Sequence, residues 1–307
     1  MRIVFMGTPE FAVPSLKILL ENRYDVVAVV TVPDKPAGRG RQTTSSQVKL
    51  FAEEHGMTVF QPQKLKDPSF IDQLRMLSPD LFIVVAFRIL PPEVFSLPKY
   101  GSFNLHASLL PKYRGAAPIN WAIINGERET GVTTFFLKET VDTGNVILQA
   151  RIPVGPDETA GEIHDKLSEI GAEVVLHSVR LIEQGKITPK PQNNELASPA
   201  PKIFKDDCRI DWNRPAGDVH NFIRGLSPRP CAFTLYNDLS LKIYRSTVST
   251  QQRSGNPGEI IFAGQRIGVQ TGNGIVEILE LQLEGKKKLS AEEFLRGFQI
   301  HVGDKFL

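Results

Sequence analysis

The sequence predicts an α/β protein of two domains, in which a mainly parallel sheet is followed by a small β-barrel. The length of 307 residues is ordinary for two domains. In the first part, short apolar runs alternate with stretches of helical periodicity, which is typical of parallel sheets covered by helices. In the last part, short strands with Gly and Asn turns follow one another closely, which is typical of a small barrel.

The first domain is predicted to extend over residues 1–189. Its apolar runs are short and nearly continuous, as expected for strands that are buried on both faces. The stretches between them carry apolar residues near helical spacing, which predicts amphipathic helices. Strands are predicted at 2–6, 25–31, 57–60, 80–86, 101–106, 132–138 and 145–152, and helices at 10–21, 45–55, 69–77, 118–125 and 159–184.

Residues 190–205 are predicted to form a linker, because Pro191, Pro199 and Pro201 are spaced among Asn, Ser and Lys. The second domain is predicted to extend over residues 206–307. Its strands are predicted at 232–236, 240–247, 258–263, 266–271 and 274–281, and its helices at 216–225 and 290–298.

Composition excludes several classes of protein. No apolar stretch approaches the ~20 residues needed to span a bilayer, and the N-terminal run ends at Gly7, so we expect a cytoplasmic protein without a membrane partner. Cys208 and Cys231 lie in no CxxC pair and beside no His cluster, so no metal site is expected. The net charge is +2, and only local basic patches can indicate a nucleic-acid partner.

The richest chemistry lies at residues 104–111. Side chains alternate along a strand, so Asn104 and His106 point the same way, and parallel sheets bind ligands where their strands end. Asn can donate to a developing oxyanion, and His can exchange a proton near neutral pH. Asp142, in the turn after strand 132–138, is placed to orient that His. Each residue also has an ordinary structural role, so spacing alone leaves both interpretations open.

A basic loop at residues 33–42 contains Lys35, Arg39 and Arg41 within seven positions. Such a loop can reach phosphates, although a solvated connection is the simpler interpretation of the residues alone. The turn at Gly7 has the position of a dinucleotide phosphate loop but lacks the GxGxxG spacing, so nicotinamide chemistry is not favoured.

Two groups in the second domain have structural interpretations. The lysine run at 286–288 is typical of a solvated turn. A group of large side chains is expected to serve core and domain packing rather than binding. This group is Trp212, His220, Phe222 and Arg224.

Residues 104–111 (Asn-Leu-His-Ala-Ser-Leu-Leu-Pro) resemble the signature of the 10-formyltetrahydrofolate-dependent formyltransferases, and residues 112–118 continue it. Residues 141–144 (Val-Asp-Thr-Gly) resemble the family's second signature, which carries its catalytic Asp. The likeness extends over the whole chain. Residues 3–11 and 33–40 are most similar to the members whose acceptor is the methionyl group on initiator tRNA.

The resemblance implies a Rossmann-like first domain and an OB-like barrel that contacts tRNA. It implies formyl transfer from 10-formyltetrahydrofolate to the α-amino group of methionine on initiator tRNA, without a metal. We also expect a monomer. The implied catalytic residues are Asn104, His106 and Asp142, the substrate-binding residues Ser108, Leu109, Leu110, Pro111 and Arg114, and the tRNA-binding residues Lys35, Arg39 and Arg41.

One segment departs from the family pattern. Residues 86–91 (Ala-Phe-Arg-Ile-Leu-Pro) are one residue shorter than the usual Ala-Tyr-Gly-containing stretch beside the family's folate pocket, so that pocket is expected to differ in detail. Two alternatives stay open: a formyltransferase for a sugar-nucleotide amine, and a non-catalytic RNA-binding module. The basic loop argues against the first, and the presence of Asn104, His106 and Asp142 against the second.

Overall fold

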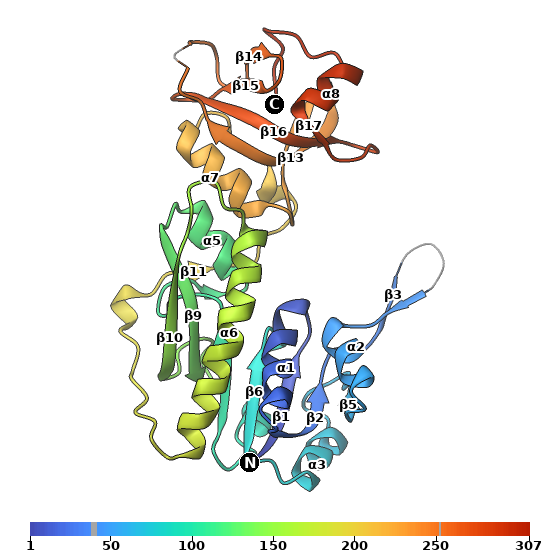
Figure 1. The fold of residues 1–307 in the computed structure, drawn as a ribbon, viewed down its shortest axis with the longest axis vertical. Helices are drawn as coiled ribbons and strands as arrows, with labels where there is room; N and C mark the ends of the chain where they lie inside the picture. The colour runs from blue at the N-terminus through green and yellow to red at the C-terminus, as the bar shows by residue number, and fades with distance from the viewer. Residues whose placement is uncertain (38–41, 252) are drawn as a thin grey trace. The chain divides into compact units, whose positions relative to one another are not determined.

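The computed structural model describes residues 1–37, 42–251 and 253–307 (Figure 1). The chain forms two compact units, and neither is one continuous segment. The N-terminal unit comprises Met1–Gly115, Gly131–Ile152 and His164–Pro199, and the C-terminal unit comprises Ala116–Thr130, Pro153–Ile163 and Ala200–Leu307.

The N-terminal unit is built on a seven-stranded sheet with the order β10-β9-β7-β6-β1-β2-β5. Five strands are parallel, and β9 pairs with β7 in the antiparallel direction. The chain passes from β1 to β2 and later returns to β6 on the other side of β1, which creates the crevice where such sheets bind ligands. The strands are β1 (Arg2–Gly7), β2 (Asp25–Val30), β5 (Val59–Phe60), β6 (Leu81–Val85), β7 (Ser102–His106), β9 (Glu129–Phe136) and β10 (Val146–Pro153).

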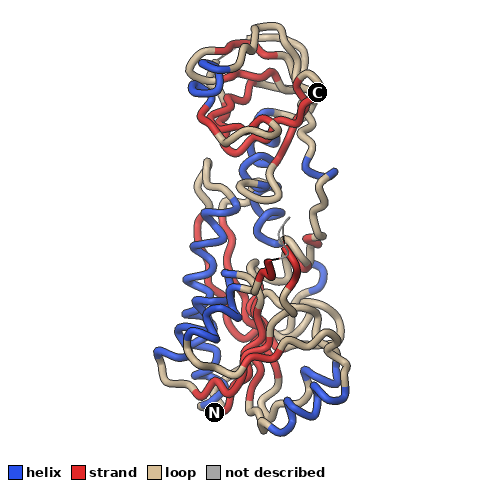
Figure 2. Tube along the Cα trace, turned by 90° about the vertical axis from the view of Figure 1, so that its right-hand side faces the viewer, coloured by secondary structure: helices blue, strands red, loops and turns tan. Residues whose placement is uncertain are grey.

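Helices lie on both sides of this sheet (Figure 2). The side chains of Ser46 and Asp67 accept backbone hydrogen bonds and so begin α2 and α3. One core cluster includes Val4, Phe82 and Leu74, all fully buried. The helices are η1 (Glu10–Ala12), α1 (Val13–Glu21), α2 (Gln47–Glu54), α3 (Pro68–Met76), α4 (Pro92–Phe95) and α6 (Ala160–Glu183), of which α6 begins in the C-terminal unit.

The C-terminal unit contains an antiparallel sheet with the order β12-β13-β16-β15-β14, and β17 pairs with β16. Inward-facing residues such as Ile243, Ile278 and Leu281 are fully buried. Its elements are α5 (Pro118–Ile124), η3 (Asp206–Cys208), α7 (Ala216–Leu226), β12 (Ala232–Tyr236), β13 (Leu239–Val248), β14 (Ile260–Ala263), β15 (Ile267–Gln270), β16 (Ile275–Leu283), β17 (Leu289–Ser290) and α8 (Ala291–Gly297).

The predicted fold class is confirmed: a mainly parallel α/β sheet is followed by an antiparallel β domain. The basic segment is more ordered than predicted, because β3 (Lys35–Ala37) and β4 (Gln42–Thr44) pair as antiparallel strands. Within the described ranges, no helix has the length and apolar content to cross a membrane. Several short elements were not predicted by the pattern: α4, η3, β17, β8 (Arg114–Gly115), η2 (Asn194–Leu196) and β11 (Pro199–Ala200).

Candidate active site

Asn104 and His106 lie at the carboxyl end of β7, on the same face of the strand. Backbone pairing fixes their height in the sheet, because Asn104 is opposite Val84 of β6 and His106 is opposite Thr133 of β9. His106 is buried, whereas Asn104 is half-buried. In the described part of the chain, the Asn104 amide has no hydrogen-bond partner, so its donor is free for a ligand.

His106 is held between a backbone carbonyl and a carboxylate. Its Nε2 lies 2.8 Å from the carbonyl oxygen of Tyr113. Because a carbonyl only accepts, Nε2 carries the hydrogen of this bond. Its Nδ1 lies 3.7 Å from Oδ2 of Asp142, which is an ion-pair distance when the ring carries a second proton. Phe135 packs edge-on against the ring, with centroids 6.5 Å apart.

Asp142 stands in a tight loop between β9 and β10. Its Oδ2 accepts a hydrogen bond of 2.9 Å from the amide of Gly115, and its φ of 56° is in the left-handed region. Such a conformation in a non-glycine residue is unfavourable and is kept only where contacts hold it. Gly144 is required by space, because a Cβ there would lie 1.5 Å from the carbonyl oxygen of Phe136. The structure thus places Asp142 against His106, with Asn104 two positions earlier on the same strand.

The residues that follow β7 form a loop fixed by local contacts. Ser108 is fully buried, and its hydroxyl donates to the carbonyl of Lys112 at 2.7 Å. Leu110 is also buried, whereas Leu109 and Pro111 are partly exposed. These contacts give Ser108 and Leu110 a role in shaping the loop.

Arg114 contacts the segment that was predicted to be a linker. Its guanidinium donates to Oε1 of Gln192 at 2.7 Å and to Oδ1 of Asn194 at 2.8 Å. Gln192 in turn donates from Nε2 to the carbonyl oxygens of Asp142 and Gly144, each at 2.8 Å. Sequence reasoning did not identify Gln192, because a polar residue among prolines and asparagines has no pattern that separates it from a solvated linker.

The basic hairpin is anchored at its base. Lys49 on α2 donates to Oδ2 of Asp34 at 2.5 Å, and Gln61 donates to Oδ1 at 2.8 Å. These hydrogen bonds, that from Lys49 first, lower the pKa of Asp34. Lys35 at the start of β3 is exposed, whereas Arg39 and Arg41 lie outside the described residues.

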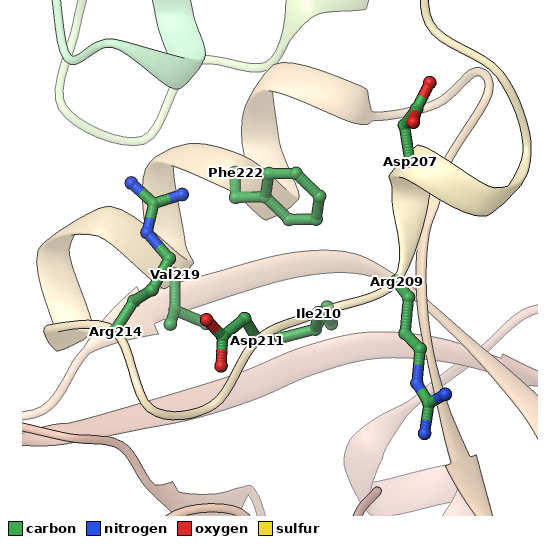
Figure 3. A pocket seen from close by; sticks show the side chains of 7 residues that line it. All are labelled: Asp207, Arg209, Ile210, Asp211, Arg214, Val219 and Phe222. Carbon is green, nitrogen blue, oxygen red and sulfur yellow. The ribbon is translucent and has the colours of Figure 1, made fainter.

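The C-terminal unit contains a separate cavity of about 90 Å³ beside α7 (Figure 3). Two aspartates and two arginines line it together with apolar side chains, so the charges of its lining are mixed. None of the predicted catalytic residues is among its lining residues. Phe222 faces this cavity from α7. Its lining residues are Asp207, Arg209, Ile210, Asp211, Arg214, Val219 and Phe222.

The packing role predicted for the neighbouring large side chains is confirmed for three of them. Trp212, His220 and Arg224 are 4%, 7% and 5% exposed, and Arg224 donates to the carbonyl oxygens of Gly155 and Glu158. Burial, ahead of the other influences, lowers the pKa of His220. In the lysine run, Lys288 pairs with Glu280 at 2.6 Å.

The described residues contain no group of three or more His, Cys, Asp and Glu side chains arranged to hold a metal ion.

Known proteins match the chain over nearly its whole length. A protein-family model described as "Formyl transferase" matches residues 1–179, and one described as "Formyl transferase, C-terminal domain" matches residues 202–299. The chain is 50% identical to the methionyl-tRNA formyltransferase of Porphyromonas gingivalis over 98% of its length and 96% of that protein's. It is 48% identical to the methionyl-tRNA formyltransferase of Citrifermentans bemidjiense, over 99% of this chain and 95% of the relative.

Solved structures share the fold at low sequence identity. The methionyl-tRNA formyltransferase of Clostridium thermocellum superposes with a TM-score of 0.59 at 18% identity, over 82% of this chain and 95% of that one. The sugar 3N-formyl transferase WlaRD superposes with a TM-score of 0.67 at 21% identity, over 94% of this chain and 99% of that one. At these identities the likeness concerns the fold alone. The two matched family models and the relatives at about half identity establish that this chain belongs to the formyl transferase family.

Proposed function

We propose that the chain transfers a formyl group to the α-amino group of methionine on methionyl-tRNA. The chemistry rests on the Asn104 amide, which has no partner among the described residues and lies two positions before His106 on β7, with Asp142 facing His106. The acceptor follows from relatives at about half identity over 98% or more of the chain, which are named for methionyl-tRNA. The sugar formyl transferases among the structural neighbours are 21–23% identical and share the fold alone, so a sugar-nucleotide acceptor is not favoured.

The proposed donor is 10-formyltetrahydrofolate, which supplies an electrophilic formyl carbon. One observation supports this donor: the Asn104 amide, which has no partner among the described residues, can donate a hydrogen bond to a formyl oxygen. Negative charge develops on that oxygen when the amine attacks, and fixed donors stabilise it. No part of this step requires a metal ligand from the chain.

We assign the proton transfer to His106 and Asp142. The Nε2 hydrogen of His106 is used by Tyr113, so Nδ1 is the position for a second proton, opposite the Asp142 carboxylate. Doubly protonated, the ring would add a positive charge to the site, two positions along β7 from the Asn104 donor. The proton that the amine loses can pass through this pair to the departing nitrogen of the donor.

We further propose that the acceptor is the initiator form of methionyl-tRNA. We also propose that the protein acts in the cytoplasm, where translation begins, and that it works as a monomer. We place formyl transfer in residues 1–189, a linker at 190–205 and an OB-like tRNA-binding domain at 206–307. Lys35, Arg39 and Arg41 would contact tRNA phosphates, while Ser108, Leu109, Leu110, Pro111 and Arg114 would shape the substrate site.

The proposed activity can be tested by incubating the chain with 10-formyltetrahydrofolate and methionyl-tRNA, then hydrolysing the ester and identifying the released amino acid by mass. Formylmethionine that accumulates with time and requires both substrates supports the proposal. Free formate with unmodified methionine would show a hydrolase instead.

A further inference from the structure

The side-chain amide of Gln192 connects the loop of Asp142 and Gly144 with the side chain of Arg114. Nε2 donates one hydrogen bond to the carbonyl oxygen of Asp142 and another to that of Gly144, each 2.8 Å long. Oε1 accepts from Nη2 of Arg114 at 2.7 Å and from its Nε at 3.2 Å. Carbonyl oxygens only accept and a guanidinium only donates, so these partners fix the orientation of the amide.

The main chain that Gln192 binds has an unfavourable conformation and little burial. Asp142 has a left-handed backbone, and the preceding Val141 is 45% exposed, so the loop gains little from burial. Left-handed non-glycine residues persist where surrounding contacts determine them. Two hydrogen bonds to the loop from one rigidly oriented amide are contacts of that kind.

The same segment also supports the other side of the site. The hydroxyl of Ser198 accepts from the amide of Tyr113 at 2.9 Å, and its carbonyl accepts from the amide of Arg114 at 2.9 Å. Tyr113 binds His106 through its carbonyl, and the amide of Gly115 binds Asp142. Residues 192–198 therefore run along the loop that holds both partners of the His106–Asp142 pair.

We propose that Gln192 is a positioning residue for the formyl transfer: it fixes the Asp142 loop so that the carboxylate faces His106. This inference rests on the proposed function. Gln192 acts through Asp142 and need not touch either substrate. A displacement of about 1 Å in a catalytic group can lower turnover by roughly 100-fold.

The sharpest variant is Gln192→Glu, which keeps the shape and the acceptor for Arg114 but sets an oxygen against two carbonyl oxygens. We expect kcat to fall by roughly 10- to 100-fold with KM for both substrates within about twofold. Gln73→Glu, on the exposed face of α3, adds the same charge to the same unit and should keep wild-type kinetics. Gln192→Leu serves as the second variant if the glutamate variant folds poorly.

A double-mutant cycle separates positioning from general structural damage. If Gln192 acts through Asp142, Asp142→Asn and the Asp142→Asn/Gln192→Glu double variant should have the same kcat. If the double variant instead loses kcat by the product of the two single-variant factors, the proposal is overturned. A Gln192→Glu variant with wild-type kcat would also overturn it.

A second readout does not depend on activity. The amide of Gly115 donates to Asp142, so its hydrogen exchange should be faster in Gln192→Glu than in wild type and Gln73→Glu. Unchanged exchange would contradict the positioning role. Failure of the proposed function would be recognised differently, because the wild-type chain itself would then transfer no formyl group.

Discussion

Asn104 and His106 are two positions apart on one strand, yet their side chains differ in their hydrogen-bond partners. His106 is fixed by Tyr113 and faces Asp142, whereas the Asn104 amide has no partner within the described residues. A half-buried amide without a partner contributes little to folding and is suited to a ligand. The loss of Asn104 should therefore affect turnover far more than stability.

We expect Asn104→Ala to lower kcat by roughly 10²- to 10³-fold, because one fixed donor to the developing oxyanion is removed. The melting temperature and the affinity for tRNA should stay near wild type. Rapid-mixing measurement of a single formyl transfer, beside thermal unfolding of the same preparation, checks this. A near-wild-type rate constant would remove Asn104 from the mechanism.

Gly144 allows the Asp142 loop to pass close to β9. A Cβ at Gly144 would lie 1.5 Å from the carbonyl oxygen of Phe136, so the loop must move to accommodate it. We expect Gly144→Ala to destabilise the fold by about 1–3 kcal/mol and to lower kcat at least tenfold. Denaturant unfolding and steady-state kinetics measure both effects. A variant as stable and active as wild type would show that the loop tolerates the shift.

At the scale of elements, hydrogen bonds to Asp34 hold the base of the β3–β4 hairpin. Asp34, just before β3, receives hydrogen bonds from Lys49 of α2 and from Gln61 after β5. The lowered pKa of Asp34 means that this contact is present above the ordinary carboxyl pKa and is lost only as the pH falls through a still lower value. The contacts of Asp34 with Lys49 and Gln61 are therefore present in kinetic assays near neutral pH.

We expect Asp34→Asn to raise KM for methionyl-tRNA by roughly 2- to 5-fold, the range expected for a partly exposed ion pair, with kcat nearly unchanged. KM for the formyl donor should not change. Glu53→Gln is the matched control, because it removes the other, more exposed carboxylate within 3.6 Å of Lys49. Equal KM values for tRNA in the three proteins would show that the anchor does not serve tRNA binding.

At the scale of the whole molecule, acid stability depends in part on the C-terminal unit. Burial alone would raise the pKa of Glu162, but hydrogen bonds from Thr159 and Arg245 outweigh it and hold the pKa at about 2. A depressed carboxyl pKa stabilises the fold above the unfolded value, and this stability is lost as the pH falls through the folded value. The window lies between about pH 5 and pH 2.

We expect Glu162→Gln to lower the free energy of unfolding at pH 7 by about 1 kcal/mol, since the carboxylate is 42% exposed and solvent screens the pair. The difference from wild type should shrink as the pH falls toward 2. Chemical denaturation at several pH values measures this. A difference that stays constant down to pH 2 would mean that the ion pair is not its cause.

Much of this architecture follows from local pattern. The bounds of β1 and α6 were predicted within a residue or two. A buried strand is a continuous apolar run, and a helix with one buried face has apolar residues at helical spacing, so both patterns are visible in the sequence. The hairpin at Lys35 was predicted as a loop, since polar residues, Pro36 and glycines hide its pairing. Two polar strands of three residues each are too short to show an alternation of apolar and polar side chains.

The candidate catalytic residues could be predicted from the sequence, but the residues that hold them in position could not. Asn104, His106 and Asp142 stand out through residue type and resemblance. Gln192 does not, because its role depends on contacts with Arg114 and Gly144, far away in the sequence. The assignment of Ala116–Thr130 and Pro153–Ile163 to the C-terminal unit likewise depends on long-range packing.

The acceptor distinguishes the proposed activity from those of the other formyl transferases, so one assay should offer the protein a choice of acceptors. Formyl transfer from 10-formyltetrahydrofolate should be followed in parallel to initiator methionyl-tRNA, elongator methionyl-tRNA, a UDP-amino sugar and water. We predict rapid formylation of the initiator tRNA and far slower transfer to the other three. Transfer to the amino sugar alone, or no consumption of the folate at all, would contradict the account.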